Sequence, residues 1–168
     1  MSREAAFEEF ARAAMPRLYR SARFLASDPH AAEDLVQETL AKVYVRWMRR
    51  LGAPLEQPQA YAHTTLVRTF LSSRRKRSST ERPAAVLPDA GTNDGDHDLR
   101  LLLTSALDTL PPVDRAVLVL RFLDDLSVAE TAERLALSEG AVRNRSMRAL
   151  GRIRDLLGSS LPDLMTQE

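Results

Sequence analysis

The chain has no cysteine and only three histidines among its 168 residues. Without cysteine it can form neither a disulfide framework nor a thiolate metal site. The histidines at positions 30, 63 and 97 are far apart in the sequence, so a zinc site built from them is not expected. We therefore expect no metal and no cofactor, and a chain suited to a reducing compartment.

Long hydrophobic runs are also missing. The first ten residues, MSREAAFEEF, carry acidic side chains where a signal peptide needs positive charge, and no hydrophobic core follows them. No other stretch approaches the roughly 20 apolar residues that cross a membrane. These absences predict a protein that has no membrane partner and stays in the cytoplasm.

Motifs that are typical of enzymes do not occur either. No nucleophile and base stand at a recognisable spacing, and the six glycines form no loop of the kind that holds phosphate groups. We therefore do not expect this protein to be an enzyme.

The formal net charge of +1 hides a division along the chain. Residues 1–77 carry a net charge of +6, residues 78–98 one of −4, and residues 99–168 one of −1. This distribution favours local basic surfaces that bind a polyanion, with an acidic segment between two parts of the chain.

Residues 78–98, SSTERPAAVLPDAGTNDGDHD, combine Pro, Gly, Ser, Thr and Asp with few apolar residues. Too little of this segment can be buried to offset the entropy of ordering it, so we expect a flexible acidic linker. No alternation typical of strands occurs on either side of it. The expected fold is all-α, with two small helical domains at residues 1–77 and 99–158 and a C-terminal tail at residues 159–168.

Apolar residues recur at helical spacing over residues 7–25 and 35–51 in the first domain. A third helix is expected over residues 59–77. Asp28 is a favourable N-cap for the second helix, with a proline directly after it. We expect Gly52 to end that helix.

The second domain begins with a helix at LRLLLTSALDTL and a further helix after the double proline at positions 111 and 112. Ser127 and Glu130 then form a capping box for VAETAERLA, and Ser138 caps EGAVRNRSMRALGRIRDLL. Two capped helices joined by a tight turn predict a helix-turn-helix, although Ala136 occupies a turn position where glycine is frequent. The residues expected on the inner face of its first helix are Ala129, Ala132 and Leu135.

The second helix of this motif is amphipathic. Val142, Ala149 and Ile153 lie within an arc of about 100° when residues are placed 100° apart. In the major groove, arginine can donate two hydrogen bonds to guanine, and asparagine can pair with adenine. A solvated face of a structural helix is the alternative, but the capped helix and turn directly before it favour DNA binding. The predicted DNA-contacting residues are Arg143, Asn144, Arg145, Met147, Arg148 and Arg152.

The segment LSVAETAERLALSEGAVRNRSMRAL resembles region 4 of extracytoplasmic-function (ECF) sigma factors of the sigma-70 family. HAAEDLVQETLAKVYVRW resembles the region 2 helix that docks on the β′ clamp of RNA polymerase, and PQAYAHTTLVRTFLSSRRKR resembles the DNA-melting part of region 2. The details are similar to the actinobacterial SigE-like branch. The resemblance covers nearly the whole chain and implies a sigma factor that recognises duplex DNA at minus-35 and captures unpaired bases at minus-10.

By this resemblance, the helix with the DLVQE motif binds core RNA polymerase at the β′ clamp helices, with the β flap as a second contact. Polar residues one helical turn apart share a face and can contact a partner helix. From the residues alone, a solvated face is the alternative. The implied polymerase-binding residues are Asp34, Leu35, Gln37 and Glu38.

The resemblance places Tyr61, Arg68 and Ser72 near the unpaired minus-10 strand, together with the loop of residues 52–58. Arg68 stands where the family commonly has asparagine, and Ser72 where an acid or asparagine is frequent, so the preferred base is left open. Trp47 belongs to an apolar stripe, which favours packing in the core over stacking on a base.

A run of four cations ends the third helix of the first domain. Cations suit a helix C-terminus, and they also suit a phosphate-binding patch. Their place beside the expected single-strand channel favours phosphate contact as the main role. The run consists of Arg74, Arg75, Lys76 and Arg77.

The alternative function is a stand-alone helix-turn-helix regulator whose first domain dimerises or senses a ligand. Such a protein binds duplex operator DNA by itself, whereas a sigma factor binds specifically only with core polymerase. The sequence leaves three means of restraint open, which are an anti-sigma factor, proteolysis and transcriptional control.

Overall fold

The computed structural model describes residues 1–26, 28–78 and 95–158. Most of the expected acidic linker and the whole expected C-terminal tail lie outside these residues. Every regular element within the described ranges is a helix, which confirms the all-α prediction. The chain divides into two compact units, residues 1–82 and 83–168.

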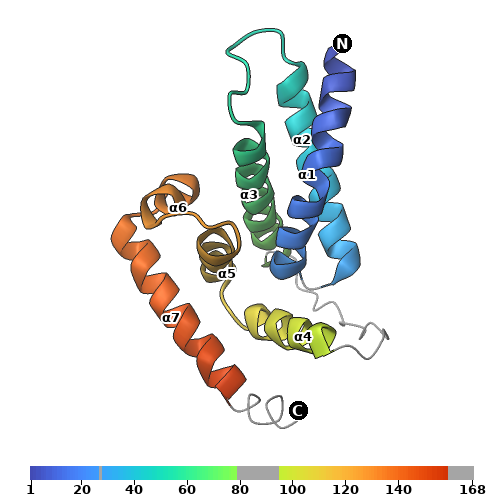
Figure 1. The fold of residues 1–168 in the computed structure, drawn as a ribbon. Coiled ribbons are helices and arrows are strands. Elements are labelled where there is room, and N and C mark those ends of the chain that lie inside the picture. The colour runs from blue at the N-terminus through green and yellow to red at the C-terminus, as the bar shows by residue number, and fades with distance from the viewer. Residues whose placement is uncertain (27, 79–94, 159–168) are drawn as a thin grey trace. The chain divides into compact units, whose positions relative to one another are not determined.

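The described residues of the first unit form three helices that pack pairwise against one another (Figure 1). They are α1 (Arg3–Leu25), α2 (Pro29–Met48) and α3 (Pro58–Ser78). Each helix turns one apolar face inward, and five of the large side chains on these faces are at most 2% exposed. The core residues include Leu18, Leu25, Val43, Leu66 and Phe70.

The predicted helix starts after Asp28 and Ser138 are confirmed. Asp28 Oδ1 accepts a hydrogen bond from the backbone N–H of Ala31 at 2.8 Å, and Pro29 is the first residue of α2. Ser138 Oγ likewise accepts from a backbone N–H in the first turn of α7, at 3.1 Å. These bonds satisfy donors that have no partner inside the helix.

The end of α2 lies earlier than predicted. The helix ends at Met48, and Leu51, which was assigned to its apolar stripe, is 91% exposed. Arg49 already has extended backbone angles (φ −61°, ψ 127°). Arg46 donates a hydrogen bond from Nη2 to the carbonyl oxygen of Ala53 at 2.8 Å, which holds the loop against the end of α2. The chain therefore leaves the helix before Leu51 could reach the core.

Within the described part of the second unit, residues 95–158, there are five helical elements (Figure 1). They are α4 (Gly95–Asp108), α5 (Pro112–Leu118), the π-helical turn η1 (Val119–Leu123), α6 (Val128–Leu135) and α7 (Glu139–Gly158). Within the unit, α7 packs against α4, α5 and α6.

Both ends of the expected linker prove to be helical. Ser78 is the last residue of α3, and residues 95–98 form the start of α4. Acidic residues such as Asp98 are favourable in the first turn of a helix because they face the positive end of its dipole. The acidic composition of this segment therefore does not prevent its last residues from being helical.

Ser127 and Glu130 form the predicted capping box at the start of α6. Ser127 Oγ accepts a hydrogen bond from the Glu130 N–H at 3.0 Å, and Glu130 Oε2 accepts one from the Ser127 N–H at 2.8 Å. The backbone N–H of Ser127, followed by its hydroxyl, lowers the pKa of the Glu130 carboxyl. The ionised carboxyl therefore contributes stability above the ordinary glutamate pKa, and this contribution is lost as pH falls through the lowered pKa.

We predict that Glu130→Gln lowers the melting temperature at neutral pH, because the amide accepts the same hydrogen bond without a charge. The difference from the unaltered chain should shrink as the pH falls below about 4.3, the ordinary glutamate pKa. Thermal circular dichroism from neutral pH to below this value measures the difference in melting temperature. The matched control is Glu133→Gln, an exposed glutamate in the same helix. Equal losses for the two variants at every pH would contradict the prediction.

Candidate nucleic-acid and polymerase interface

The packing of α6 on α7 forms the predicted helix-turn-helix. Three buried residues lie at its centre, with exposed fractions of 5% or less, and three partly buried residues pack around them. Small side chains at the centre allow the two helices to approach closely. The central residues are Val117, Ala132 and Val142, and those around them are Val128, Leu135 and Leu137.

The turn between the two helices has left-handed backbone at Ala136 (φ 53°, ψ 44°). Glycine is favoured at such a position because it has no Cβ, but alanine adopts it here. The next residue, Leu137, donates a backbone hydrogen bond to the Ala132 carbonyl at 2.9 Å. Ala129, which was expected on the inner face, is exposed, and Thr131 is buried instead. The expectation was wrong because residue 131 shares the inner side of the helix with 128, 132 and 135, whereas residue 129 does not.

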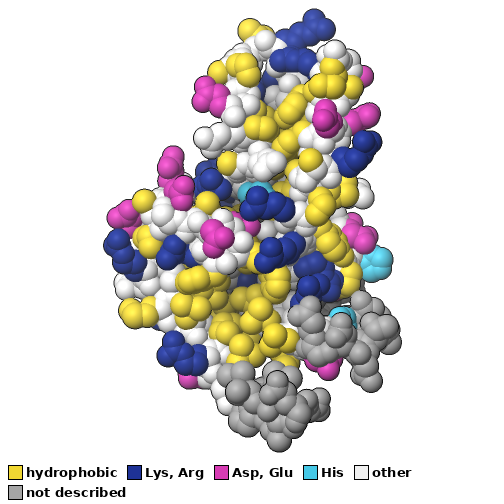
Figure 2. Space-filling model, in the orientation of Figure 1, with side chains coloured by type: hydrophobic (Ala, Val, Ile, Leu, Met, Phe, Trp, Pro, Cys, Tyr) yellow, Lys and Arg dark blue, Asp and Glu magenta, His cyan; other side chains and the backbone are white. Residues whose placement is uncertain are grey.

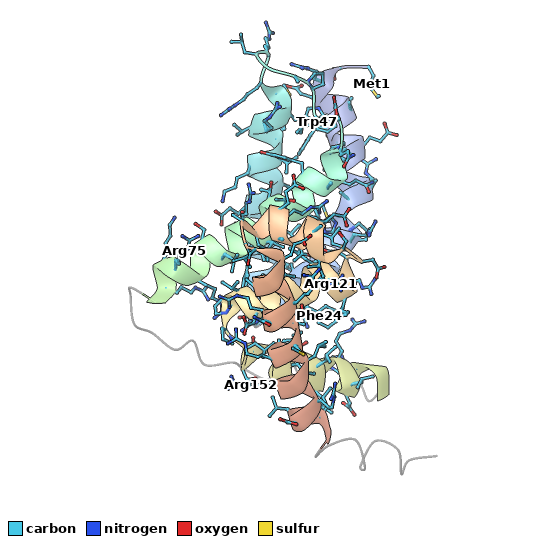
Figure 3. The ribbon with its side chains drawn as sticks, turned by 90° about the vertical axis from the view of Figure 1, so that its left-hand side faces the viewer. Met1, Phe24, Trp47, Arg75, Arg121 and Arg152 are labelled. Atoms are coloured by element: carbon cyan, nitrogen blue, oxygen red, sulfur yellow. The ribbon has the colours of Figure 1, made fainter. Side chains whose placement is uncertain are left out.

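Five of the six predicted DNA-contacting residues lie on the exposed side of α7. The opposite side is buried through Val142, Ala149 and Ile153, which are 9% exposed or less. Figure 3 labels Arg152 on the C-terminal half of the helix. The exposed residues are Arg143, Asn144, Met147, Arg148 and Arg152. The structure therefore brings a polar and basic surface together along one side of the helix.

Arg145 is the exception among the six. Its side chain is 31% exposed, and Nη1 lies 2.6 Å from Oδ1 of Asp114 in α5, whose side chain is 8% exposed. By contrast, Arg143 is 62% exposed, and its Nη2 lies 3.8 Å from Oε2 of the exposed Glu139. Sequence reasoning missed Asp114 because 31 residues separate it from its partner.

The predicted minus-10 residues of α3 share one face. Tyr61, Arg68 and Ser72 are seven and then four residues apart, so they lie along one side of the helix. All three are exposed, Tyr61 at 36%. On the other side, Leu66 and Phe70 are buried in the core. Burial of that side thus leaves the three predicted residues at the surface.

The basic run at the end of α3 is not uniform. The guanidinium carbon of Arg74 lies 5.5 Å from the centre of the Phe70 ring, and this side chain is half-buried. Arg75, Lys76 and Arg77 are exposed, and Figure 3 shows Arg75 near the C-terminal end of the helix. A cation–π contact therefore holds one member of the run against the unit, and the other three extend the basic surface.

Trp47 packs against aromatic residues of α1, as predicted, but it stays half-buried. Its ring stacks on Phe10 at 5.2 Å between centroids and meets the edge of Phe7 at 5.7 Å. Its Nε1 donates a hydrogen bond to the carbonyl oxygen of Arg3 at 3.2 Å. Trp47 also borders a cavity of about 260 Å³ between the start of α1, the end of α2 and the following loop. The other residues that line this cavity are Arg3, Ala6, Arg46, Arg49, Gly52, Ala53, Pro54 and Leu55.

Of the four predicted polymerase-binding residues, Asp34, Gln37 and Glu38 are exposed on α2. Leu35 is only 7% exposed. It lies on the side of α2 that also buries Val36 and residues 39 and 43. Leu35 therefore belongs to the core and not to the docking face, because its position on the helix directs it toward α1 and α3.

A groove of about 880 Å³ lies between α1 and α2, and Gln37 is one of its lining residues. Most of the groove is apolar, and Glu8, Arg12 and Glu33 add charge to its lining. The apolar lining residues include Phe7, Ala11, Met15, Val36 and Leu40. Sequence reasoning missed the groove because two helices must pack together to form it.

Among the residues that the structure describes, no three histidine or acidic side chains lie close enough to hold a metal ion. None of the described helices is long and apolar enough to cross a membrane.

The chain matches two family models, sigma-70 region 2 over residues 10–80 and sigma-70 region 4 over residues 100–153. It is 39% identical over 155 residues to the RNA polymerase sigma-E factor of Streptomyces avermitilis, covering 91% of this chain and 86% of that one. It is 33% identical over 162 residues to the ECF RNA polymerase sigma factor SigE of Mycolicibacterium smegmatis, covering 90% of this chain and 61% of that one.

Among solved structures, the chain is similar to the sigma factor RpoE of Bartonella quintana, whose structure contains the anti-sigma factor NepR. The TM-score is 0.68 at 26% identity, and the match covers 91% of this chain and 97% of that one. The presence of both sigma regions does not favour a stand-alone regulator. The family consists of initiation factors without catalytic activity. The chain therefore belongs to the sigma-70 family, as an ECF sigma factor of the SigE-like branch that directs promoter-specific transcription initiation by RNA polymerase.

Proposed function

We propose that the exposed side of α7 binds duplex DNA at the minus-35 element. The observation that carries this proposal is the exposure of Arg143, Asn144 and Arg148 directly after a capped helix and a tight turn. These side chains offer the donors and acceptors that recognise base edges in the major groove. Arg143 can exchange its exposed pairing with Glu139 for a phosphate, because an exposed ion pair contributes little stability.

The face of α3 with Tyr61, Arg68 and Ser72 binds the unpaired minus-10 strand in this proposal. An exposed tyrosine ring provides a surface on which a base can stack, and the cations at the end of α3 neutralise phosphates. The cavity beside the loop of residues 52–58 contains three arginines, which suits a flipped base and its phosphate. The predicted domains at residues 1–77 and 99–158 would then contact separate promoter elements.

The exposed acids and amide of α2 form the docking face for the β′ clamp helices in this proposal. Asp34, Gln37 and Glu38 supply acceptors for a basic helix of the partner. The groove beside Gln37 offers apolar surface that such a helix can bury. An anti-sigma factor, as found with RpoE of Bartonella quintana, would restrain this chain if it covered the same face.

The β flap is the second polymerase contact that we propose, on the face where α4 and α7 pack together. Figure 2 shows hydrophobic side chains gathering on one side of the second unit. Four leucines of α4 and α7 are 38–44% exposed, on more than one side of these helices, so each helix offers apolar surface to a partner. They are Leu99, Leu101, Leu150 and Leu156.

The mechanism that follows is differential binding without catalysis, in the cytoplasm where RNA polymerase acts. Opening the minus-10 base pairs costs free energy, and capture of the unpaired strand offsets that cost. Contacts made only with open DNA lower the barrier to opening, whereas contacts made equally with closed DNA do not. The minus-35 contacts of α7 therefore determine where the holoenzyme binds on the promoter, and the minus-10 contacts of α3 drive the opening of the base pairs.

Run-off transcription with purified core RNA polymerase tests the function. We expect the full chain with core enzyme to produce discrete transcripts from genomic fragments, and the mapped start sites to share sequences near minus-35 and minus-10. The matched controls are core enzyme alone and the chain alone, which should each give no discrete start. Protection of duplex DNA by the chain alone would instead support the stand-alone regulator.

We predict that the double variant Asp34→Ala, Gln37→Ala loses core polymerase in a pull-down without promoter DNA, by about tenfold or more in affinity. Both side chains are exposed, so the helical circular dichroism should not change. The matched control is Glu56→Ala, Gln57→Ala, an exposed acid and amide in the loop before α3. Undiminished recovery of core enzyme by the first variant would refute the docking assignment.

We predict that Arg148→Ala relaxes the sequence preference at one minus-35 position and costs about 1–3 kcal/mol of promoter binding by the holoenzyme. Selection from a library randomised at minus-35 measures the preference. Arg154→Ala is the matched control, because this exposed arginine of the same helix lies outside the predicted DNA-contacting set. An unchanged preference in the Arg148 variant would show that this residue does not contact a base.

A further inference from the structure

Arg145 differs from the other arginines of α7 in the partner that it binds. Its Nη1 lies 2.6 Å from Asp114 Oδ1, within the range of a strong charge-assisted hydrogen bond. Arg145 is 31% exposed and Asp114 8%, whereas the pair formed by Arg143 and Glu139 is more than half exposed on both sides. The Arg145 side chain therefore extends along the interface between α5 and α7 and not away from it.

The α5 helix that carries Asp114 is itself fixed by its next residue. Arg115 is 2% exposed, and its Nη1 lies 2.9 Å from Oδ1 of Asp108 in α4. Its Nη2 also donates to the Asp108 carbonyl oxygen at 3.2 Å. Two consecutive residues of α5 thus form ion pairs with two different helices, Asp114 with α7 and Arg115 with the end of α4. Asp114 is therefore a well-fixed point to which α7 is joined.

The energetics of burial keep Arg145 at this point. A buried carboxylate that loses its counter-charge retains the cost of desolvation without the compensating attraction. If Arg145 moved out to a base or a phosphate, Asp114 would be left as a buried carboxylate without a counter-charge. Arg143 can exchange its acidic partner for DNA at little cost, because water can solvate the exposed Glu139 when Arg143 leaves it.

The pair also fixes the rotation of α7 about its own axis. The buried contacts of α7 include Val142 and Ala149, whose side chains are short and can tolerate a small rotation of the helix. A hydrogen-bonded ion pair has a defined direction and limits that rotation. Arg145 is next to Asn144 and three residues before Arg148, so the direction in which these two side chains point depends on the pair.

We propose that Asp114 is a positioning residue for minus-35 recognition and that Arg145 is its partner, not a base-contacting residue. This inference rests on the proposed function, in which the exposed side of α7 binds the minus-35 duplex. Asp114 aims Asn144 and Arg148 at the base edges without touching DNA. The sixth member of the predicted DNA-contacting set therefore acts inside the unit.

The variant Asp114→Asn tests this assignment, because the two roles of Arg145 give effects of opposite sign. The holoenzyme binds a promoter duplex with its mapped minus-35 element and the same duplex with that element scrambled, and the ratio of the two affinities is measured. If Asp114 positions α7, the ratio falls by about tenfold. If Arg145 contacts DNA, removing the competing carboxylate strengthens binding, and an unchanged or higher ratio overturns the proposal.

The matched control is Glu139→Gln, which also removes an acid that pairs with an arginine of α7. Because that pair is exposed, we expect the ratio to stay the same or rise. A fall equal to that of Asp114→Asn would overturn the proposal, since it would show that loss of any acidic partner is sufficient. Thermal circular dichroism of each chain establishes that the second unit is folded at the assay temperature.

Two further variants cover the remaining cases. Should Asp114→Asn unfold the second unit, Arg145→Lys keeps a cation opposite the carboxylate, and the ratio should stay within about threefold of the unaltered value. A larger loss from folded Arg145→Lys would overturn the proposal. Arg145→Gln should leave the slope of log affinity against log salt unchanged, whereas loss of a phosphate contact reduces it by about 1. A reduced slope would likewise overturn the proposal.

Failure of the proposed function is recognised separately. If the unaltered holoenzyme binds the mapped and the scrambled duplex equally, α7 does not recognise the minus-35 element, and the proposed function fails together with the role of Asp114. If Arg148→Ala lowers the ratio and Asp114→Asn does not, the function stands and only the positioning role is lost.

Discussion

Burial of Val142 against Val117 and Ala132 decides which side of α7 is available to DNA. In a straight helix, the direction of one side chain fixes the directions of all the others. Once Val142 faces inward, Arg143 and Arg148 must face solvent. The same constraint applies to α3, where the buried apolar side leaves the predicted minus-10 residues on the surface. Each proposed recognition face thus exists because the opposite face of its helix completes a small core.

The second unit uses charge as well as apolar contact to hold its helices. Arg115 is among the largest fully buried side chains of the described residues and is paired with Asp108. Buried ion pairs add little net stability, because desolvation offsets much of their attraction. What they add is direction, since hydrogen bonds between charged groups have a preferred geometry and contacts between aliphatic side chains do not. Direction is what a recognition helix needs when it must match base edges.

In the first unit, one lysine links the two proposed binding faces. Lys42 Nζ lies 3.0 Å from Glu38 Oε1 on the proposed docking face and donates to Thr69 Oγ1 of α3 at 3.1 Å. Thr69 is buried directly beside the exposed Arg68. A short path within one three-helix unit therefore joins the proposed docking face to the proposed minus-10 face. Two promoter contacts made by one anchored chain would act at a high effective concentration.

The sequence by itself determined the all-α class, the capped helix starts and the helix-turn-helix, because caps and the 3.6-residue period depend on residues that are close along the chain. The family resemblance added the expected docking and minus-10 residues. Only the tertiary structure decided that Leu35 is buried, that α2 ends before Leu51 and that Arg145 binds Asp114. Each of these depends on a surface or partner contributed by another part of the fold, and no local pattern encodes it. The sequence marks which helices carry function, and packing between helices selects which of their side chains are exposed to perform it.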